Sequence, residues 1–350
     1  MLLKKTMVKV LFTDPLLLGS NSYELYRAFK KNKNCKVYVL DEKKRNSVYD
    51  NVSDSFFAKL MFKLKIPLDW AKLNKLLSLY DYSDINIIFI INGISIKPLT
   101  LKRIKIKNPR VKIISFSLDD MYAWHNRSLY YTLTLKYYDL VVTTKSYNVK
   151  ELTDIGAKSV LFLYQGFSKY IHKPHNCLNQ EMKKVLFIGF FEKDRYESIL
   201  FLAENGIKVH IFGIGWDKVI NTHKNLIIHN YLLIGKEYSR EISCSKISLC
   251  FLRKVNRDLH TSRSLEIPAC KGFMLAERTA EHEELFVDGS EAVFFDSNID
   301  LLRKVVFYLD NEDIRVSIAN KGYFRCLRED YSYNGMVDKI LEHAGKLWNA

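Results

Sequence analysis

A segment between residues 258 and 266 concentrates polar side chains that could bind a phosphate group. It contains Asp258, His260, Thr261, Ser262, Arg263, Ser264 and Glu266. We expect a short apolar helix to begin near Glu266, and the first amide groups of a helix are unpaired donors at the positive end of its dipole. Arg263 adds a guanidinium that can hold phosphate through two hydrogen bonds. Glu266 could accept hydrogen bonds from ribose hydroxyls, so the segment predicts a site for a nucleoside diphosphate.

The same residues allow an interpretation in which no ligand binds. Arg263 and Glu266 stand at spacing i,i+3, and an ion pair at that spacing would stabilise an ordinary helix of an α/β domain. On spacing alone, both interpretations stay open.

Adjacent carboxylates at Asp119 and Asp120 follow an apolar, strand-like run. One of them could orient or deprotonate a hydroxyl group, and a pair of this kind could also bind Mg²⁺. The alternative is that they cap the segment that follows. His125 is close enough in sequence to share this site, although a lone His is more often structural. Glu281 and His282 form a further candidate pair, for which helix capping is the alternative.

Length and composition point to a globular chain with more than one core. The chain has 350 residues, of which 48% are hydrophobic and 27% charged. Single cores rarely grow beyond about 250–300 residues, so we expect two domains. The longest apolar candidate, 85–96, is short and interrupted by Asn92 and Gly93, and the N-terminus lacks a signal-peptide pattern. We therefore expect a cytoplasmic protein.

The cysteines show no pattern that holds a metal. They are Cys35, Cys177, Cys244, Cys250, Cys270 and Cys326. None is spaced as in a zinc site, so we expect reduced thiols and no structural metal.

The excess of positive charge lies in the first half of the chain. Residues 1–175 contain 30 Lys and Arg against 14 Asp and Glu, whereas the remainder contains 24 against 25. A basic half can face nucleic acid, an anionic membrane or a polyanionic substrate. The alternative is a solvated, lysine-rich surface. Because no RNA-binding or DNA-reading pattern is apparent, we expect a membrane surface before nucleic acid.

Apolar runs rich in β-branched residues alternate with helical patterns throughout, which predicts parallel sheets with crossover helices. The expected strands lie at 8–12, 36–40, 85–90, 111–116, 140–144 and 159–163, and again at 184–189, 208–213, 226–230, 247–252, 273–276 and 292–295. Helical patterns occur at 23–31 and at 58–80, where Pro67 interrupts the second. The fold class is therefore α/β, with doubly wound, Rossmann-like domains whose ligands bind at the carboxyl ends of the strands.

A polar segment with the turn former Pro174 separates the two sets of strands. We expect an N-terminal domain over 1–172, a linker over 173–183 and a C-terminal domain over 184–332. The last stretch, 333–350, is expected to form a helix that packs on the N-terminal domain.

Several blocks resemble a known family. They are FIGFFEKDR (187–195), FGIGW (212–216), the stretch 245–295 with TSRSLEIPAC (261–270), and 308–333. The first half matches more loosely, through SLDD (117–120) and 137–160. Together these blocks resemble the group-1 glycosyltransferase domain of CgeB-like proteins. The resemblance implies a GT-B fold, in which two Rossmann-like domains face a central cleft.

The resemblance also implies roles for residues of the second domain. Glu266 would contact the ribose of a nucleotide-sugar donor, and Asp258 would stand near the sugar in a D-x7-E pattern where many retaining relatives have E-x7-E. The diphosphate would lie among Gly189, Arg195, His260, Thr261, Arg263 and Ser264. The base pocket would be shaped by Gly213 and Trp216, with His229 and Tyr231 as weaker candidates. Trp216 could equally be part of the core, and Arg195 could equally lie outside the site.

The implied activity is transfer of a sugar, of the hexosyl type, from a nucleoside-diphosphate sugar carrying UDP or GDP to a hydroxyl acceptor. The acceptor would be a bacterial surface glycan or a lipid-linked saccharide at the inner face of the membrane. The reaction would be metal-independent and retaining, with Asp120, Asp14, His125 and Asp258 as candidate catalytic groups. Asp14 could instead form an Asp-Pro turn. Two alternatives remain: a nucleotide-sugar epimerase of the same fold, and a non-catalytic nucleotide-binding protein associated with membranes.

Overall fold

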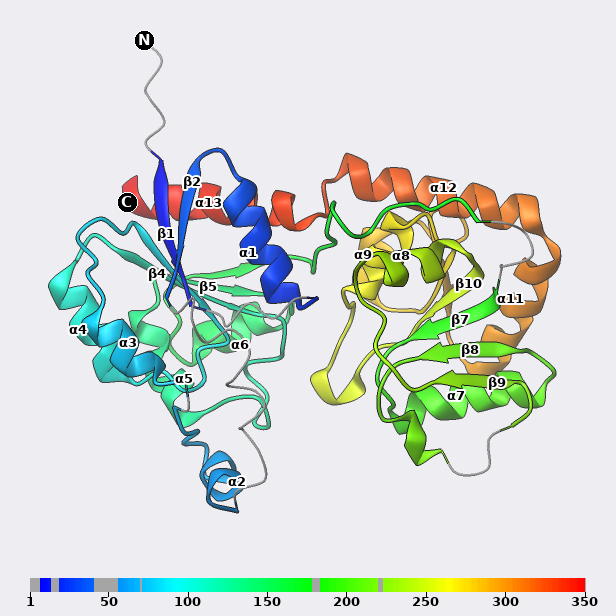
Figure 1. Ribbon diagram of the computed structural model, residues 1–350, viewed down its shortest axis with the longest axis horizontal. Helices are drawn as coiled ribbons and strands as arrows, with labels where there is room; N and C mark the ends of the chain where they lie inside the picture. The colour runs from blue at the N-terminus through cyan, green and yellow to red at the C-terminus, as the bar shows by residue number, and fades with distance from the viewer. Residues whose placement is uncertain are drawn as a thin grey trace, which may run out of the picture. The chain divides into compact units, whose positions relative to one another are not determined.

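The structure, a computed structural model, describes residues 7–13, 19–40, 56–69, 71–177, 183–219 and 223–349. The chain divides into two compact units, one of Met1–Tyr164 with Tyr333–Ala350 and one of Gln165–Ser332. Each unit contains one sheet (Figure 1).

The first unit is built on a six-stranded parallel sheet of order β2-β1-β3-β4-β5-β6. Its strands are β1 (Val8–Phe12), β2 (Cys35–Val39), β3 (Ile87–Ile91), β4 (Lys112–Ser117), β5 (Leu140–Thr143) and β6 (Val160–Phe162). The central strands are apolar on both sides because helices cover both faces of the sheet.

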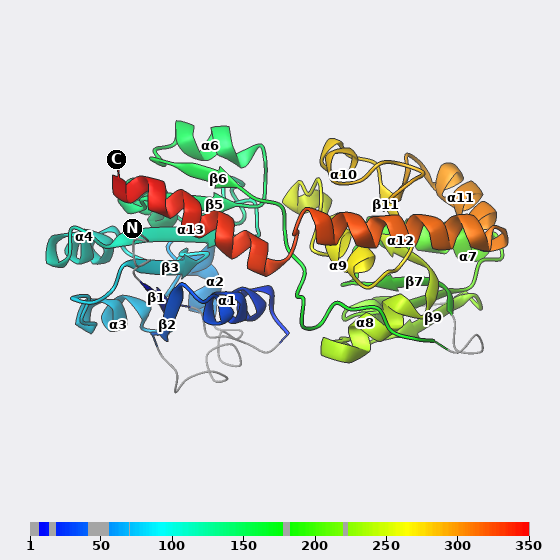
Figure 2. The ribbon, with the colours of Figure 1, turned by 90° about the horizontal axis from the view of Figure 1, so that it is seen from above.

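The helices of the first unit form two layers. They are α1 (Asn21–Lys31), α2 (Phe56–Lys63), α3 (Leu73–Leu79), α4 (Pro98–Lys107), α5 (Leu129–Thr134), η2 (Leu135–Tyr137), α6 (Asn148–Asp154) and α13 (Tyr333–Asn349). Helices α1 and α13 contact each other over one face (Figure 2). Helices α3, α4 and α5 pack on the other face (Figure 1). The apolar stripe Met336, Val337, Ile340 and Ala344 fixes the face that α13 buries.

The second unit repeats this architecture with a parallel sheet of order β12-β11-β10-β7-β8-β9. The strands are β7 (Lys183–Ile188), β8 (Val209–Phe212), β9 (Leu226–His229), β10 (Ser245–Cys250), β11 (Met274–Glu277) and β12 (Val293–Phe295). The helices are α7 (Lys193–Glu204), η4 (Trp216–Lys218), α8 (Gly235–Ser243), η5 (Lys254–Asn256), α9 (Arg263–Ala269), α10 (Ala280–Leu285), α11 (Asn298–Asp310) and α12 (Glu312–Arg328). Residues of α7 and α11 share one core with the sheet.

The strand order of the second unit creates a place for a ligand. The chain runs outward from β7 through β8 to β9 and then returns to the other side of β7 to form β10. The connections that leave β7 and β10 therefore diverge at the carboxyl ends of these two neighbouring strands. A crevice at such a switch point is where doubly wound sheets bind their ligands.

The prediction of two doubly wound α/β domains is confirmed, and each of the twelve expected strands overlaps an observed one. The boundaries differ in detail. The first unit ends at Tyr164, before the expected 172, and described residues of the expected linker, such as His175, contact α8 of the second unit. Helix α13 belongs to the first unit. No helix in the described ranges combines the length and apolarity needed to cross a membrane.

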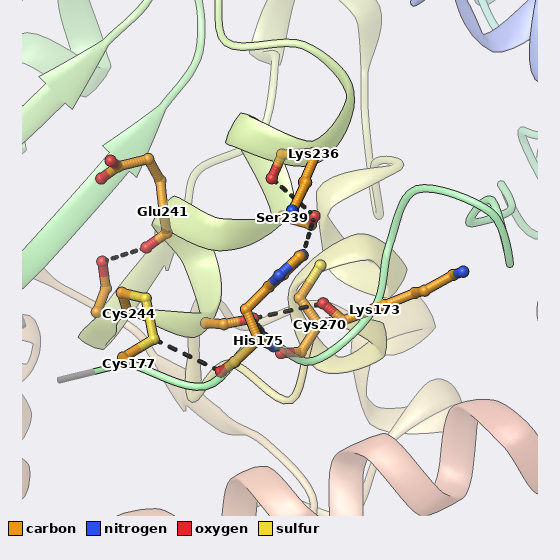
Figure 3. Close-up of a disulfide and its surroundings, with 10 residues drawn as sticks. Lys173, His175, Cys177, Lys236, Ser239, Glu241, Cys244 and Cys270 are labelled. Carbon is orange, nitrogen blue, oxygen red and sulfur yellow. Dashed lines mark hydrogen bonds between the residues drawn. A yellow bond between two sulfur atoms is a disulfide. The ribbon is translucent and has the colours of Figure 1, made fainter.

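The prediction that all cysteines are reduced is wrong for one pair. Cys177 and Cys244 form a disulfide, with Cα atoms 5.4 Å apart and a sequence separation of 67 (Figure 3). Cys35, Cys250, Cys270 and Cys326 are free and buried. The spacing of the two bonded cysteines carried no signal, because only the packing of residues 173–177 against α8 brings them together.

Candidate active site

The loop that leads to α9 positions the polar segment found in the sequence. Helix α9 begins at Arg263 rather than near Glu266, so the expected start was wrong by nearly one turn. The amides of Ser264 and Leu265 already donate to the carbonyls of Thr261 and Ser262. This tight first turn uses amide donors that the sequence predicts to be unpaired. The cationic side chains therefore matter more than the helix end for binding an anion.

Two arginines converge at the switch point. Arg195 of α7 and Arg263 of α9 each place the guanidinium carbon 5.9 Å from the centre of the Phe187 ring. Arg195 donates to the carbonyl of Phe190 at 3.2 Å, and Arg263 donates to that of Phe251 at 3.2 Å. These carbonyls follow β7 and β10, so the backbone at the two diverging strand ends holds both cations.

The charge around these arginines is not balanced. Arg195 is only 3% exposed, and burial together with the nearby Arg263 lowers its pKa to about 10. Its Nε and Nη2 atoms, and Nε of Arg263, are buried without a hydrogen-bond partner among the described residues. Glu192 lies 3.5 Å from Arg195 but is shared with Arg253, which donates to it at 3.1 Å. Buried donors and excess positive charge make this place suited to an anion.

Glu266 is held by a residue that the sequence did not reveal. Its Oε2 accepts a hydrogen bond from the hydroxyl of Tyr238 at 2.5 Å, and its Oε1 lies 3.8 Å from Nε2 of His172. The alternative pairing of Glu266 with Arg263 is not what the structure has, because Arg263 turns to the Phe251 carbonyl. Tyr238 is on α8, and no spacing relates it to the 258–266 segment. Glu266 is 7% exposed as a residue and stands one helical turn after Arg263.

Two histidines stabilise the loop before α9 from inside. His260 accepts a hydrogen bond from the amide of Gln165 at 2.9 Å through Nε2 and contacts Glu281 through Nδ1. His282 donates from Nδ1 to the Glu277 carbonyl at 2.7 Å, so its Nε2 accepts the Ser264 hydroxyl at 2.7 Å. His260 and Ser264, which we predicted to bind the diphosphate, thus have internal partners that shape the loop.

Asp258 and Thr261 are buried members of the same loop. Asp258 accepts a hydrogen bond from the side-chain amide of Asn256 at 2.7 Å, and the Thr261 amide donates to the Ser264 hydroxyl at 3.0 Å. The D-x7-E pattern therefore consists of one carboxylate in an ordered loop, that of Asp258, and one on helix α9, that of Glu266.

Gly213 of the predicted base pocket and Gly189 of the predicted diphosphate site bring two loops into close contact. A Cβ atom on Gly213, where φ is +152°, would lie 2.0 Å from the carbonyl oxygen of Gly189. The same carbonyl accepts a hydrogen bond from the indole of Trp216 at 2.9 Å. Trp216 is 1% exposed and packs against Phe187, so its ring belongs to the core and presents no face on which a base could stack.

Exposed apolar side chains surround this edge of the sheet. Phe190, Ile214, Tyr231 and Val255 follow β7, β8, β9 and β10 and are 58%, 44%, 52% and 66% exposed. Tyr231 contacts Phe212, on which His229 stacks at 4.2 Å. Sequence reasoning missed Phe190, although its place directly after β7 was a usable signal. Apolar groups around two arginines are what a base and a sugar require.

The candidate residues of the first unit differ in how deeply they are buried. Asp120 is fully buried, and its Oδ1 accepts hydrogen bonds from the amides of Tyr122 and Ala123 and from the side chain of Asn148. These are the contacts expected if Asp120 caps the segment that follows it. His125 is exposed in the same loop. Asp14 lies outside the described residues.

A metal-binding cluster is not found in the described part of the chain: no three or more His, Cys, Asp and Glu side chains there could hold an ion together.

Residues 195–342 match a family model described as glycosyl transferase-like. A comparison with curated proteins finds no match to this sequence. The family match covers most of the second unit and extends into α13, and it includes Arg195, Asp258, Arg263 and Glu266.

Solved structures share the fold at low sequence identity. HepE from Anabaena, in a complex with UDP and glucose, aligns with a TM-score of 0.63 at 13% identity over 96% of this chain and 100% of its own. Sucrose-phosphate synthase from Thermosynechococcus elongatus aligns with a TM-score of 0.69 at 10% identity, over 98% and 99%. A putative UDP-N-acetylglucosamine 2-epimerase from Listeria monocytogenes gives 0.56 at 10% identity, over 96% and 95%. The chain thus has the GT-B fold, and that fold accommodates more than one reaction.

Proposed function

We propose that this chain is a glycosyltransferase that moves a sugar from a nucleoside-diphosphate sugar to a hydroxyl acceptor. One observation carries the proposal: Arg195 and Arg263 meet at the switch point of the second sheet with three buried nitrogen atoms that have no partner among the described residues. A bound diphosphate would supply acceptors for these donors and reduce the repulsion between the two cations. The family match over residues 195–342 supports the same activity.

Transfer breaks the bond between the anomeric carbon and the phosphate oxygen, and the electron pair leaves with the nucleoside diphosphate. Arg195 and Arg263 would stabilise the charge that develops on the leaving group. Backbone carbonyls already hold both guanidinium groups in place, so little reorganisation is needed. We propose that these side chains act without a metal ion. Activity that persists in EDTA would support this part, and loss of activity restored by Mg²⁺ would contradict it.

We propose UDP as the carrier of the sugar, because HepE binds UDP and UDP-glucose and shares the fold. GDP is the alternative. Thermal-shift measurements with UDP, GDP, TDP, CDP and ADP decide between them, since a ligand at 100 times its dissociation constant stabilises a protein by about 2.7 kcal/mol. Failure of all five nucleotides to bind would contradict the proposed function.

We propose that the anomeric configuration is retained. The grounds are Asp258 and Glu266 at the D-x7-E spacing and the resemblance to CgeB-like proteins. Membership of the CgeB-like branch is itself a prediction. Asp258 would lie beside the transferred hexose. The test is the anomeric configuration of the first product formed, read by proton NMR before mutarotation. An inverted product would contradict this assignment.

The acceptor is proposed to be a hydroxyl of a surface glycan or a lipid-linked saccharide, met at an anionic membrane by the basic first unit. Phe56, Leu64 and Trp124 are 81%, 57% and 69% exposed. Lys65 follows Leu64 in the chain, and its Nζ lies 5.2 Å from the Trp124 ring centre. Exposed apolar groups with lysines favour a membrane interface. Co-sedimentation of the protein with phosphatidylglycerol vesicles but not with phosphatidylcholine vesicles would support this location. Recovery of equal amounts of the protein in the supernatant with both kinds of vesicle would contradict it.

An epimerase of the same fold is the second candidate, favoured by the alignment with the Listeria structure. The two reactions differ in their need for an acceptor. A glycosyltransferase releases UDP from a UDP-sugar faster when a hydroxyl acceptor is added, whereas an epimerase converts the UDP-sugar into its epimer in the absence of any acceptor. Tight UDP binding without either turnover would indicate the non-catalytic alternative.

A further inference from the structure

The last residue of β11, Glu277, lies at the carboxyl edge of the sheet of the second unit. In the register of the parallel strands β10 and β11, Cys250 lies opposite Ala276, so the residues that follow β10 run beside Glu277. Oε1 of Glu277 accepts a hydrogen bond from the backbone amide of Leu252 at 3.2 Å. In the described part of the chain, this is the one hydrogen bond that the Glu277 carboxylate accepts. The carboxylate is therefore directed at the backbone that leaves β10.

One peptide group connects Glu277 to Arg263. The amide that donates to Glu277 belongs to the peptide bond between Phe251 and Leu252, and the carbonyl of that same bond accepts from Nη2 of Arg263 at 3.2 Å. Because a peptide group is planar, its carbonyl cannot turn unless its amide turns too. The two charges agree with the peptide dipole, since the cation is at the oxygen and the anion is at the N–H. Each of these two hydrogen bonds therefore strengthens the other.

The position of Glu277 is itself fixed by its backbone. Its carbonyl accepts a hydrogen bond from Nδ1 of His282 at 2.7 Å. Lys254, a nearby cation whose charge acts on Glu277, has its Nζ 3.0 Å from a carboxylate oxygen of Asp194. The side chain of Glu277 is thus left to hold the amide of Leu252.

The same peptide also carries a ring that lies beneath the arginines. Phe251 is 1% exposed, and its ring centre lies 5.4 Å from that of Phe187. Arg195 and Arg263 both lie over the Phe187 ring. A turn of this peptide would therefore displace the oxygen that holds Arg263 together with part of the apolar surface on which both cations rest.

We propose that Glu277 is a positioning residue for the donor: it holds the peptide between Phe251 and Leu252 so that the carbonyl of this peptide directs Arg263 toward the diphosphate. The inference rests on the proposed function, because it takes Arg263 as a ligand of the diphosphate. Glu277 acts through Arg263, so its contribution depends on the presence of that side chain. A carboxylate near an anion also repels it. The test therefore keeps the charge at position 277 constant and varies only the acceptor atom.

The test compares two neutral residues of similar length at position 277. Glu277→Gln keeps an oxygen that can accept the Leu252 amide, whereas Glu277→Met has no such atom. Because both variants remove the same charge, their difference measures the hydrogen bond. In calorimetry, Glu277→Gln should bind UDP about threefold or more tightly than Glu277→Met, which is the value of one hydrogen bond. Should Glu277→Met not fold, Glu277→Ala takes its place in the comparison.

A double-mutant cycle then asks whether Glu277 acts through Arg263. The same two substitutions are made in the Arg263→Ala variant, where the carbonyl of Phe251 has no guanidinium to direct. There, the two proteins should bind UDP within about twofold of each other. A residue that contributed to folding alone would give the same ratio of affinities with and without Arg263.

Glu291 supplies the matched control. Its Oε2 also accepts a backbone amide, that of Val287 at 3.0 Å, but it precedes β12 and so lies at the opposite edge of the parallel sheet. Glu291→Gln and Glu291→Met should bind UDP within about twofold of each other.

Two results overturn the inference and leave the proposed function intact. One is equal binding of UDP by Glu277→Gln and Glu277→Met, and the other is a difference between them that persists undiminished in Arg263→Ala. Should GDP, TDP, CDP or ADP bind the unmodified protein in place of UDP, that nucleotide is used throughout the cycle. Failure of the unmodified protein to bind any of the five overturns both the inference and the proposed function.

Discussion

The hydroxyl of Tyr238 lies 2.5 Å from Oε2 of Glu266, and this hydrogen bond joins α8 to α9. Burial, followed by the charge of Glu266, raises the pKa of Tyr238 well above its usual range, so the phenol remains a donor. The bond assigns one carboxylate oxygen to the protein and leaves the other facing His172. A ligand that binds Glu266 therefore meets an oriented carboxylate.

Removing the cations at the switch point should weaken nucleotide binding. Arg263→Ala and Arg195→Ala each delete hydrogen bonds between charged groups, which are worth about 1.5–3 kcal/mol, and Glu266→Ala should cost 1 kcal/mol or more, about the value of such a bond. UDP affinity measured by calorimetry should fall by at least about fivefold in each variant.

The control for the arginine variants is Arg303→Ala, because Arg303 is exposed and, among the described residues, pairs only with Asp300 of its own helix. Its affinity for UDP should stay that of the unmodified protein. Unchanged affinity in both arginine variants would refute the diphosphate site.

Gly213 cannot accept a side chain. In Gly213→Ala the new Cβ would lie 2.0 Å from the Gly189 carbonyl oxygen, and the φ of +152° is one that alanine rarely adopts. We expect a loss of about 2 kcal/mol or more in the free energy of unfolding, measured with urea. Gly345→Ala in α13 meets no atom within 4 Å and should be neutral or stabilising by up to about 1 kcal/mol. Equal stability of both variants would contradict the clash.

Stability should fall on acidification because of His282. Burial lowers the pKa of this side chain from 6.5 to about 4, so the folded protein does not bind the proton that the unfolded chain binds in that window. The contribution of His282 is complete above pH 6.5 and is lost as the pH falls toward 4, by on the order of 3 kcal/mol. Urea unfolding of His282→Gln should show a smaller loss over the same range than the unmodified protein. Parallel pH profiles of the two proteins would refute this role.

Reduction of the disulfide should destabilise the second unit. The bond joins Cys177 to Cys244 across 67 residues, and closure of a loop of this size is worth about 2–4 kcal/mol. A dithiol reductant should lower the melting temperature of the unmodified protein, whereas the double variant Cys177→Ser with Cys244→Ser should melt at the lower temperature with or without reductant. Free thiols at both positions, found by alkylation and mass spectrometry of the protein as purified, would contradict the bond.

The sequence was sufficient to locate the strands because that signal is local. Runs such as 85–90 and 247–252 are apolar since both faces of a parallel strand are buried, and each strand reveals this by itself. The pattern at 333–348 likewise predicted α13, whose apolar stripe recurs at helical spacing. The site segment 258–266 was also readable, because its polar side chains are close together in the chain.

Contacts between distant segments had no such signal. From the sequence, Trp216 could belong to the core or to the base pocket. Its contacts with the Gly189 carbonyl and with Phe187 place it in the core. His260 and Ser264 stay predicted ligand-binding groups, and the structure adds their internal partners Gln165 and His282. Each outcome depends on a partner that no spacing in the sequence identifies.

The sequence alone determined two doubly wound domains and placed Arg263 and Glu266 in one short segment where a helix begins, because burial and helical spacing are properties of neighbouring residues. Only the tertiary structure decided that Arg195 joins Arg263, that Tyr238 and His172 flank Glu266, and that Cys177 bonds to Cys244. These contacts arise because the chain returns past β7 to form β10. This return brings the loops and helices of separate crossovers to one edge of the sheet.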